Sequence, residues 1–286
     1  MKATFDIERL RRYSYIFSRS GFSSIIDNND CSRLSNLFRG YDSKNDKEWT
    51  YFDYVKYLYN TLANHYRCEY IYKNTLIDSL LKKYGTKNSL ILNEFKVGNS
   101  VADIVFFNGT SKAFEIKTEL DSNKRLSGQL SDYSKIFKES YIVTHESLIN
   151  KYETVNDTVG IIALKVNNGK VKIQEIRPAV ENKEIDVNIL MRSIRTNEYK
   201  NIIQNFYGLL PNVNSFDMFE TCKKMMYPIP PDELHELFIT EIKKRKSNNV
   251  LLNQCQRELK QFCLSINISE AQYQVFSERL SKPINY

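Results

Sequence analysis

Residues 101–117 read VADIVFFNGTSKAFEIK, and this stretch predicts two β-strands joined by a turn. Val101 to Phe107 and Ala113 to Lys117 are short runs rich in β-branched and aromatic residues, and Asn108-Gly109 between them is a hairpin signal. A further β-rich run begins at Ser89 and is separated from the first by a glycine. The three runs together predict a three-stranded meander.

The spacing of charged residues on these strands predicts that they share a groove. Side chains at alternate positions of a strand point to one face, so Glu115 and Lys117 point the same way while Ile116 packs opposite them. Facing residues in a hairpin have a constant index sum, so Asp103 lies opposite Glu115 only if the loop has an odd number of residues or a bulge intervenes. We predict such an odd loop, or a bulge, at Asn108-Gly109, where the glycine can take a left-handed conformation.

This arrangement of residue types points to metal-assisted hydrolysis. Two facing carboxylates repel each other unless they are protonated or hold a cation, and hard oxygen ligands suit Mg²⁺ or Mn²⁺. Such an ion orients a water, lowers its pKa and neutralises charge on a scissile phosphate. Lys117 would position the nucleophile or stabilise the pentacovalent phosphate, so the predicted reaction is phosphodiester hydrolysis.

The elements around the meander predict an α/β (α+β) fold with a mixed sheet and flanking helices. Apolar residues spaced near 3.6 predict a helix over 66–84, and Asp121-Ser122 is expected to cap another that runs to about Glu139. A strand is expected at Tyr141 to Thr144. The two runs that flank Asn167-Asn168-Gly169 are expected to form a hairpin.

Beyond Pro178 the strand patterns cease, and helices are expected instead, one of them over residues 184–206. We therefore expect three consecutive regions, which are a helical N-terminal region over 1–64, a core over 65–178 and a helical C-terminal domain over 179–286. The aromatic cluster from Trp49 to Tyr59 is interpreted as core packing rather than as a surface for stacking bases.

The residues of the meander resemble the signature of the PD-(D/E)XK nuclease superfamily: Asp103, eleven intervening residues, then Glu115-Ile116-Lys117. Gln129-Leu-Ser-Asp-Tyr133 downstream resembles the Q-x-x-x-Y motif of the RecB and λ-exonuclease branch, and its spacing puts both side chains on one helical face. The proline that names the motif is replaced by Ala102. The block from Asn93 to Gln129 is also similar to a poorly characterised bacterial family of that superfamily, often associated with defence or mobile-element genes.

The resemblance implies a restriction-endonuclease-like sheet and assigns roles to the residues of the motif. Asp103, Glu115 and the carbonyl of Ile116 would ligate Mg²⁺ or Mn²⁺, and Lys117 would be catalytic and contact nucleic acid. Gln129 and Tyr133 would support the active site; alternatively they are a surface amide and a half-buried core tyrosine.

Three further residues are second-tier candidates. The superfamily often adds an acidic ligand from the helix before the sheet, where Glu69 lies, and Glu94 on the first strand competes for that role. Arg125 would bind a phosphate of the nucleic acid, or it pairs with Asp121 or Asp132.

The composition narrows the class of protein. The formal charge of +7 at pH 7 is compatible with a polyanionic partner, and no apolar run approaches the length that a bilayer needs. Five scattered cysteines without a CxxC pair suit a reducing compartment, so a cytoplasmic location is expected. With three histidines, catalysis is expected to rest on carboxylates and lysine.

Two functions follow from these patterns. The first is a Mg²⁺- or Mn²⁺-dependent nuclease that acts on DNA rather than RNA, in phage defence or a mobile element. The alternative is an inactive nuclease-fold module that binds nucleic acid or a partner protein. A regulatory protein partner and the oligomeric state are left open.

Overall fold

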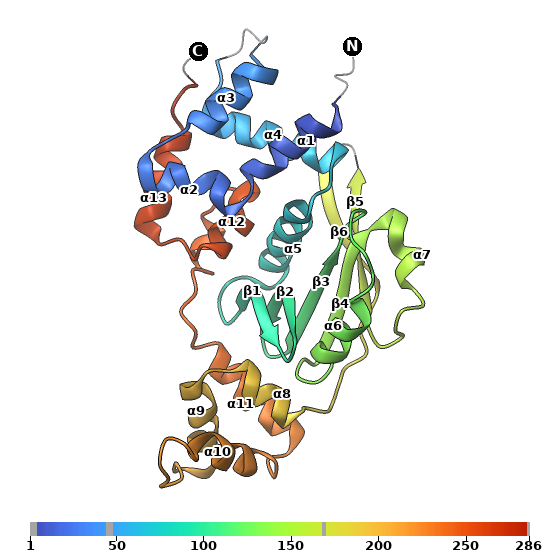
Figure 1. Cartoon of the computed structure of the whole chain (residues 1–286), viewed down its shortest axis with the longest axis vertical. Coiled ribbons are helices and arrows are strands. Elements are labelled where there is room, and N and C mark those ends of the chain that lie inside the picture. The colour runs from blue at the N-terminus through green and yellow to red at the C-terminus, as the bar shows by residue number, and fades with distance from the viewer. Residues whose placement is uncertain (1–4, 44–47, 168–169, 285–286) are drawn as a thin grey trace. The chain divides into compact units, whose positions relative to one another are not determined.

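The protein contains a sheet of six strands in the order β1-β2-β3-β4-β5-β6, which is also their order along the chain. The computed structural model describes residues 5–43, 48–167 and 170–284, and its elements are labelled in Figure 1. The strands are β1 (Leu90–Val97), β2 (Ser100–Phe107), β3 (Ser111–Lys117), β4 (Glu139–His145), β5 (Gly160–Asn167) and β6 (Lys170–Arg177). The pairs β1–β2 and β2–β3 are antiparallel and β3–β4 is parallel, so the sheet is mixed, as the sequence predicts.

The contacts within the chain divide it into two compact units that are both discontinuous in sequence. Unit 1 takes residues 1–83, 164–173 and 248–286, and unit 2 takes residues 84–163 and 174–247. This grouping differs from the three consecutive regions expected above, whose boundaries stay a prediction. The turn expected at Asn168-Gly169 lies outside the described residues.

Unit 1 is mainly helical. Its helices are α1 (Ile7–Ile16), α2 (Arg19–Asn28), α3 (Ser32–Tyr41), α4 (Tyr51–His65), α5 (Glu69–Tyr84, whose last residue belongs to unit 2), η2 (Leu251–Asn253), η3 (Arg257–Leu259), α12 (Lys260–Ser265) and α13 (Glu270–Leu280). Phe22 joins α2 to the C-terminal helices, because its ring lies 4.8 Å from the ring centroid of Phe262 and 5.6 Å from that of Phe276. Tyr54 and Tyr59 on α4 are buried and confirm the interpretation as core for part of the aromatic cluster, whose other members, Trp49, Tyr51, Phe52 and Tyr57, are half-buried.

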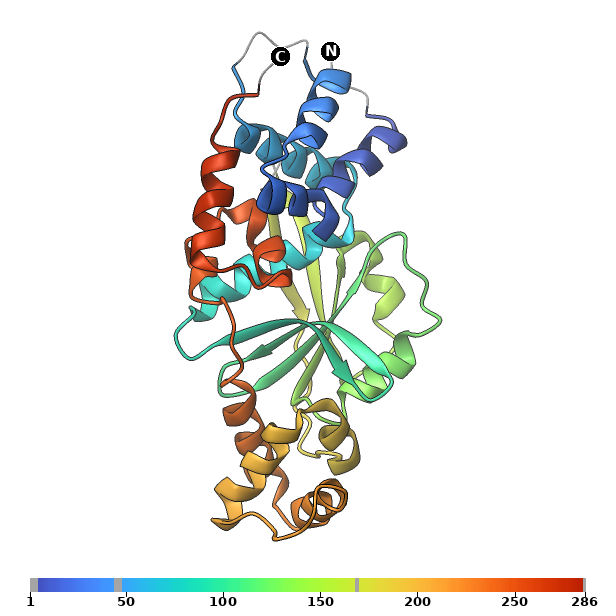
Figure 2. The same cartoon turned by 60° about the vertical axis from the view of Figure 1, so that its left-hand side comes forward.

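In unit 2, helices pack against apolar side chains of the first four strands. These helices are α6 (Leu126–Tyr133), η1 (Glu146–Leu148), α7 (Ile149–Tyr152), α8 (Val187–Ser193), α9 (Thr196–Tyr207), α10 (Met218–Met226) and α11 (Pro231–Ile242). Leu130 of α6 belongs to one buried cluster with Val105, Ala113, Leu190 and Phe238. Figures 1 and 2 show α6 beside the strands and α8–α11 gathered at one end of β1 and β2.

Two predicted helices in unit 2 are wrong in extent. The helix expected from Asp121 to Glu139 begins only at Leu126 and ends at Tyr133, because the Asp121 carboxylate accepts the backbone N–H (2.7 Å) and hydroxyl (2.8 Å) of Thr118 and closes a turn instead of capping the helix. The helix expected over 184–206 is split into α8 and α9 at Ile194, whose backbone is extended.

The described residues include no helix with the length and apolar character that crossing a membrane requires.

Candidate functional site

The β2–β3 hairpin places Asp103 and Glu115 across from each other. Its ladder runs from Phe107↔Ser111 to Ile104↔Phe114, so three residues form the loop, and Gly109 within it has a φ of +82°. The odd loop that the sequence predicts is therefore confirmed. Extending this register by one position brings Asp103 opposite Glu115.

Asp103 also ties the two strands together where their ladder ends. Its Oδ2 accepts the backbone N–H of Ile116 at 2.8 Å. The backbone pairing of β2 with β3 ends at Ile104. Just beyond it, the side chain of Asp103 bonds to the backbone of β3 instead. The contact fixes one carboxylate oxygen of Asp103 next to the main chain between Glu115 and Lys117.

Glu115 and Lys117 form a buried ion pair. They lie two positions apart on β3, so both side chains point to one face, and Lys117 Nζ lies 2.8 Å from Glu115 Oε1. Glu115 is 2% exposed and Lys117 7% exposed. A buried pair of this kind needs further hydrogen bonds to offset its desolvation.

The helix α6 supplies those further bonds through Gln129 and Tyr133. Gln129 Oε1 accepts from Lys117 Nζ at 3.3 Å, and the Tyr133 hydroxyl lies 2.6 Å from Glu115 Oε2. The same hydroxyl lies 2.8 Å from the carbonyl oxygen of Val101, so it can donate to either acceptor. Both side chains reach the site because they are four residues apart on one helical face, as predicted.

Tyr133 is held in its protonated form. Burial raises the pKa of its hydroxyl above the ordinary tyrosine value, and the charge of Glu115 and the hydrogen bond to it add to this rise. Near neutral pH the phenol is therefore a hydrogen-bond donor and not a base or nucleophile.

Three elements, β2, β3 and α6, converge on this site, and their side chains suit the chemistry of a divalent cation and an anion. The carboxylates of Asp103 and Glu115 offer hard oxygen atoms, and Lys117 offers a positive charge. Within residues 5–43, 48–167 and 170–284, no three His, Cys, Asp or Glu side chains form a group that could hold a metal ion. For an ion held by Asp103 and Glu115, water or substrate would supply further ligands.

Glu94 lies on β1 at the position across from Asp103. The pairs Asn93↔Ile104 and Phe95↔Ala102 flank it, and its own φ of +56° is in the left-handed region, which is uncommon for residues other than glycine. Its exposed side chain lines a pocket of about 380 Å³. Its role as a metal ligand stays a prediction.

Glu69 starts α5 in unit 1, where it forms an ion pair with the buried Lys73 one turn later. Lys73 thus balances the charge of Glu69. The role of Glu69 as a metal ligand also stays a prediction.

Arg125 stands exposed just before α6. The two carboxylates considered as its partners are bonded elsewhere, since Asp121 accepts from Thr118 and Asp132 accepts the Ser100 hydroxyl at 2.7 Å. Among the described residues Arg125 forms no ion pair, so the alternative reading of a local pair is not supported.

Thr144 of β4 contacts the end of β3 and His145 lies near Glu119 just after it, and the sequence did not single out either residue. The Thr144 hydroxyl donates to the backbone carbonyl of Lys117 at 2.8 Å and so fixes the main chain that carries this lysine. His145 Nδ1 accepts the backbone N–H of Ser147 at 3.2 Å and lies 4.0 Å from Glu119 Oε1. Thr144 faces Lys117 because β3 and β4 pair in parallel, and no local sequence pattern predicts this pairing.

Comparison with known proteins adds a family. A model of the family described as Bacteriophage P4 protein cII matches residues 62–266, which include the residues of the site from Asp103 to Tyr133. Protein cII of Enterobacteria phage P4 is 29% identical over 177 residues, which are 60% of this chain and 66% of that protein. The chain thus spans just under two thirds of that relative's length.

One solved structure is also similar, the SPO1766 protein of unknown function from Silicibacter pomeroyi. It is 11% identical, has a TM-score of 0.33, and the match covers 51% of this chain and 94% of that one. A TM-score this low supports no inference about this chain.

Proposed function

This chain belongs to the bacteriophage P4 protein cII family, and we propose that it is a divalent-metal-dependent nuclease of the PD-(D/E)XK superfamily that hydrolyses phosphodiester bonds of DNA in preference to RNA. One observation carries the proposal. Side-chain hydrogen bonds join Glu115, Lys117, Gln129 and Tyr133, which were chosen from a sequence pattern, and the fifth residue of that pattern, Asp103, is bonded to the backbone of Ile116 between Glu115 and Lys117. The phage relative is in keeping with the predicted setting of a mobile element.

The order of elements supports a restriction-endonuclease-like core. An antiparallel meander is followed by a helix and by a strand parallel to β3, and α6 lies in the connection that parallel neighbours require. The network therefore lies between β2, β3 and the helix after the signature strand, where the Q-x-x-x-Y branch would have it.

The donor set fits Mg²⁺ or Mn²⁺. Mg²⁺ is usually bound by one or two carboxylates together with waters and substrate phosphates, and Asp103 and Glu115 are two facing carboxylates. They and the carbonyl of Ile116 would hold the ion, which would supply a water of lowered pKa and neutralise phosphate charge. In the structure the Lys117 ammonium lies at Glu115 Oε1, so this lysine would leave that oxygen when a metal binds.

The other side chains of the network have distinct tasks. Lys117, once released from Glu115, would stabilise the negative charge that develops on the phosphate. Gln129 lies within hydrogen-bond reach of the Lys117 ammonium and would orient it. Tyr133 donates to Glu115 and would keep that carboxylate turned toward the site, so it is a positioning residue.

The pocket beside Glu94 supports a polyanionic substrate. It is lined by Lys96 of β1, Arg195 before α9, and Arg245 and Lys246 after α11. Arg245 is neutralised by Glu198, whose oxygen lies 2.6 Å from its Nε, so Lys96, Arg195 and Lys246 are the cations that a phosphate backbone would meet.

One observation favours the alternative of an inactive module that binds nucleic acid or a protein. Both carboxylate oxygens of Glu115 are engaged, one by Lys117 and the other by Tyr133. If that network does not open, no metal can reach Glu115 and the fold serves binding alone.

The experiment compares cleavage of circular single-stranded DNA, linear duplex DNA and RNA with Mg²⁺, with Mn²⁺ and with EDTA. Asp103→Ala and Lys117→Ala are expected to abolish metal-dependent cleavage, because each removes a member of the network. Lys112→Ala is the matched control, since Lys112 lies on the same strand and pairs with Glu139 outside the network. Equal cleavage by parent and Asp103→Ala would disprove the nuclease, and Mn²⁺ binding measured by calorimetry would separate loss of the metal from loss of chemistry.

A further inference from the structure

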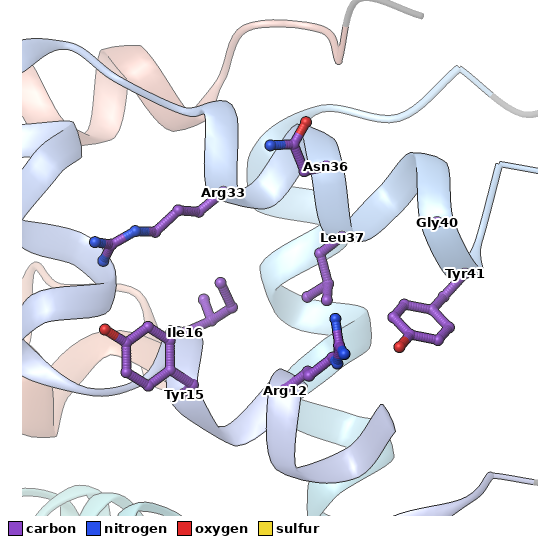
Figure 3. A pocket seen from close by; sticks show the side chains of 8 residues that line it. All are labelled: Arg12, Tyr15, Ile16, Arg33, Asn36, Leu37, Gly40 and Tyr41. Carbon is purple, nitrogen blue, oxygen red and sulfur yellow. The ribbon is translucent and has the colours of Figure 1, made fainter. Parts of the chain in front are cut away.

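A groove of about 600 Å³ lies between α1 and α3 in unit 1. Ile16 and Leu37 form its apolar centre, and Arg12, Arg33 and Asn36 add polar groups around them. Figure 3 shows these side chains extending from the two helices. The volume lies within the range of pockets that take small organic ligands.

One end of the groove pairs an exposed aromatic ring with a guanidinium. Tyr15 is 51% exposed, and the guanidinium carbon of Arg33 lies 5.6 Å from its ring centroid, within cation–π range. Arg33 also donates to the carbonyl of Ser20, and the Ser20 hydroxyl donates to the Tyr15 hydroxyl at 3.2 Å. These contacts hold the guanidinium over one face of the ring, while about half of the Tyr15 side chain stays accessible.

A second aromatic ring, that of Tyr41, lies at the other end of the groove, and neighbouring side chains hold it in place. The guanidinium carbon of Arg9 lies 5.3 Å from the ring centroid of Tyr41, and the ring of Tyr13 meets it edge-on at 6.3 Å. Arg9 itself is anchored to Asp42 at 2.5 Å. Tyr41 is thus a stable wall of the groove.

The groove carries positive charge that can bind an anion. Arg12 pairs with Glu8 at 2.7 Å, but both side chains are more than half exposed, and surface pairs of this kind contribute little. A phosphate can therefore replace Glu8 as the partner of Arg12 and form charge-assisted hydrogen bonds.

We propose that this groove binds an unpaired nucleotide of single-stranded nucleic acid, with the base stacked on Tyr15 and the phosphates held by Arg33 and Arg12. Base stacking needs an accessible π-face, which an unpaired base offers and a duplex withholds. Asn36 supplies the amide that recognition of base edges uses. The residues that line the groove precede residue 62, so it lies outside the segment that matches the family.

The experiment measures fluorescence anisotropy of a labelled single-stranded DNA, the same sequence as RNA, and the corresponding DNA duplex, all in EDTA. Chelation stops metal-dependent cleavage, so the oligonucleotides stay intact, and the variants of the groove separate its binding from binding at the pocket beside Glu94. Both single strands are expected to bind more tightly than the duplex. Polyglutamate serves as the competitor that represents an acidic peptide.

Three variants test the groove and one controls for charge. Tyr15→Ala is expected to weaken single-strand binding about tenfold, the size of one lost base stack, while Tyr15→Phe keeps it. Arg33→Ala is expected to lower the salt dependence by about 0.7 in the log–log slope, as one lost phosphate contact would. Arg11→Ala removes a neighbouring exposed arginine of α1 that does not line the groove, and it should leave the slope closer to that of the parent.

Gly40 lines the groove and allows a variant with a side chain there without strain in the fold. A Cβ built there meets no atom within 4 Å, and glutamine is a better helix former than glycine, so Gly40→Gln should fold and bind weakly. Equal binding by Gly40→Gln and the parent would overturn the proposal. So would equal losses in Arg33→Ala and Arg11→Ala, equal affinity for the duplex, or displacement of the oligonucleotide by polyglutamate at the same charge concentration.

Discussion

Asp42 in unit 1 and Glu115 in unit 2 are both buried carboxylates with several hydrogen-bond donors, but their surroundings differ. Asp42 follows α3 and accepts from Arg9 at 2.5 Å, from Tyr13 at 2.7 Å, from Tyr54 at 2.8 Å and from Tyr57 at 3.1 Å. Those donors come from α1 and α4, so the carboxylate joins three helices.

Glu115 accepts from Lys117 and Tyr133 and lies across from a second carboxylate, Asp103. Two facing carboxylates raise the energy of the folded state unless a cation lies between them. The contrast is that helices alone supply the donors around Asp42, whereas a second carboxylate lies across the strands from Glu115, as the proposed metal site requires.

The contrast is tested most strongly at Glu115. Glu115→Gln should lower kcat by about 10³-fold, the size of effect seen when one group that stabilises a transition state is removed. Its free energy of unfolding should change less than that of Asp42→Asn, because relief of the repulsion with Asp103 offsets the loss of the counter-charge of Lys117. Cleavage assays and urea unfolding of the same preparation check both halves, and a large loss of stability would make Glu115 resemble Asp42.

The reverse outcome is expected at Asp42. Asp42→Asn should cost about 3 kcal/mol of unfolding free energy, because it leaves the half-buried guanidinium of Arg9 without its counter-charge. Cleavage per folded molecule should not change. Asp27→Asn on α2 is the control, since that side chain is exposed, and comparable destabilisation of both variants would contradict the structural role of Asp42.

Acid should weaken unit 1 through Asp78. Burial opposes ionisation of this carboxyl, but its bonds to Lys260 (2.8 Å) and Lys82 (2.6 Å) outweigh burial and lower its pKa below the ordinary 3.8. A carboxyl with a lowered folded-state pKa adds stability above its unfolded-state pKa, and this stability is lost as pH falls through the folded-state pKa. The loss is therefore expected below about pH 4.

Asp78→Asn should lower the free energy of unfolding at neutral pH by about 2 kcal/mol, because Lys260 stays buried without its counter-charge. The loss of stability between neutral and acid pH should also be smaller in this variant, so the acid limb of its stability curve should be flatter. Urea unfolding across the acid range measures both quantities. An acid limb as steep in the variant as in the parent would assign the effect to another carboxyl, such as Glu198, whose pKa is also lowered because its bonds to Arg245 outweigh burial.

The smallest effect is expected at Tyr133. Tyr133→Phe keeps the ring but removes the donor to Glu115, so kcat should fall about tenfold, which corresponds to about 1.4 kcal/mol. Because the pKa of Tyr133 is raised, its hydroxyl does not ionise in the working range, and the alkaline side of the pH–rate profile should keep its shape. A shift of that side in the variant would show that Tyr133 ionises during turnover.

Several features of the fold and the site were accessible to sequence reasoning because they depend on neighbours along the chain. Alternation on β3 put Glu115 and Lys117 on one face, and the odd loop after Phe107 fixed the facing partner of Glu115. The four-residue spacing on α6 aligned Gln129 with Tyr133. The end of α6 was wrong by several residues, because a helix ends where tertiary packing and competing side-chain bonds stop supporting it.

By itself the sequence determined the strands of the meander, the odd length of the β2–β3 loop and which residues share a face on β3 and on α6, since turn length and side-chain periodicity act over a few residues. Only the tertiary structure decided that Asp42 joins α1 to α4, that Asp78 on α5 meets Lys260, and that Thr144 holds the backbone of Lys117. These bonds join residues that the chain brings together from a distance. Their formation depends on where packed helices and parallel strands return, which no local pattern specifies.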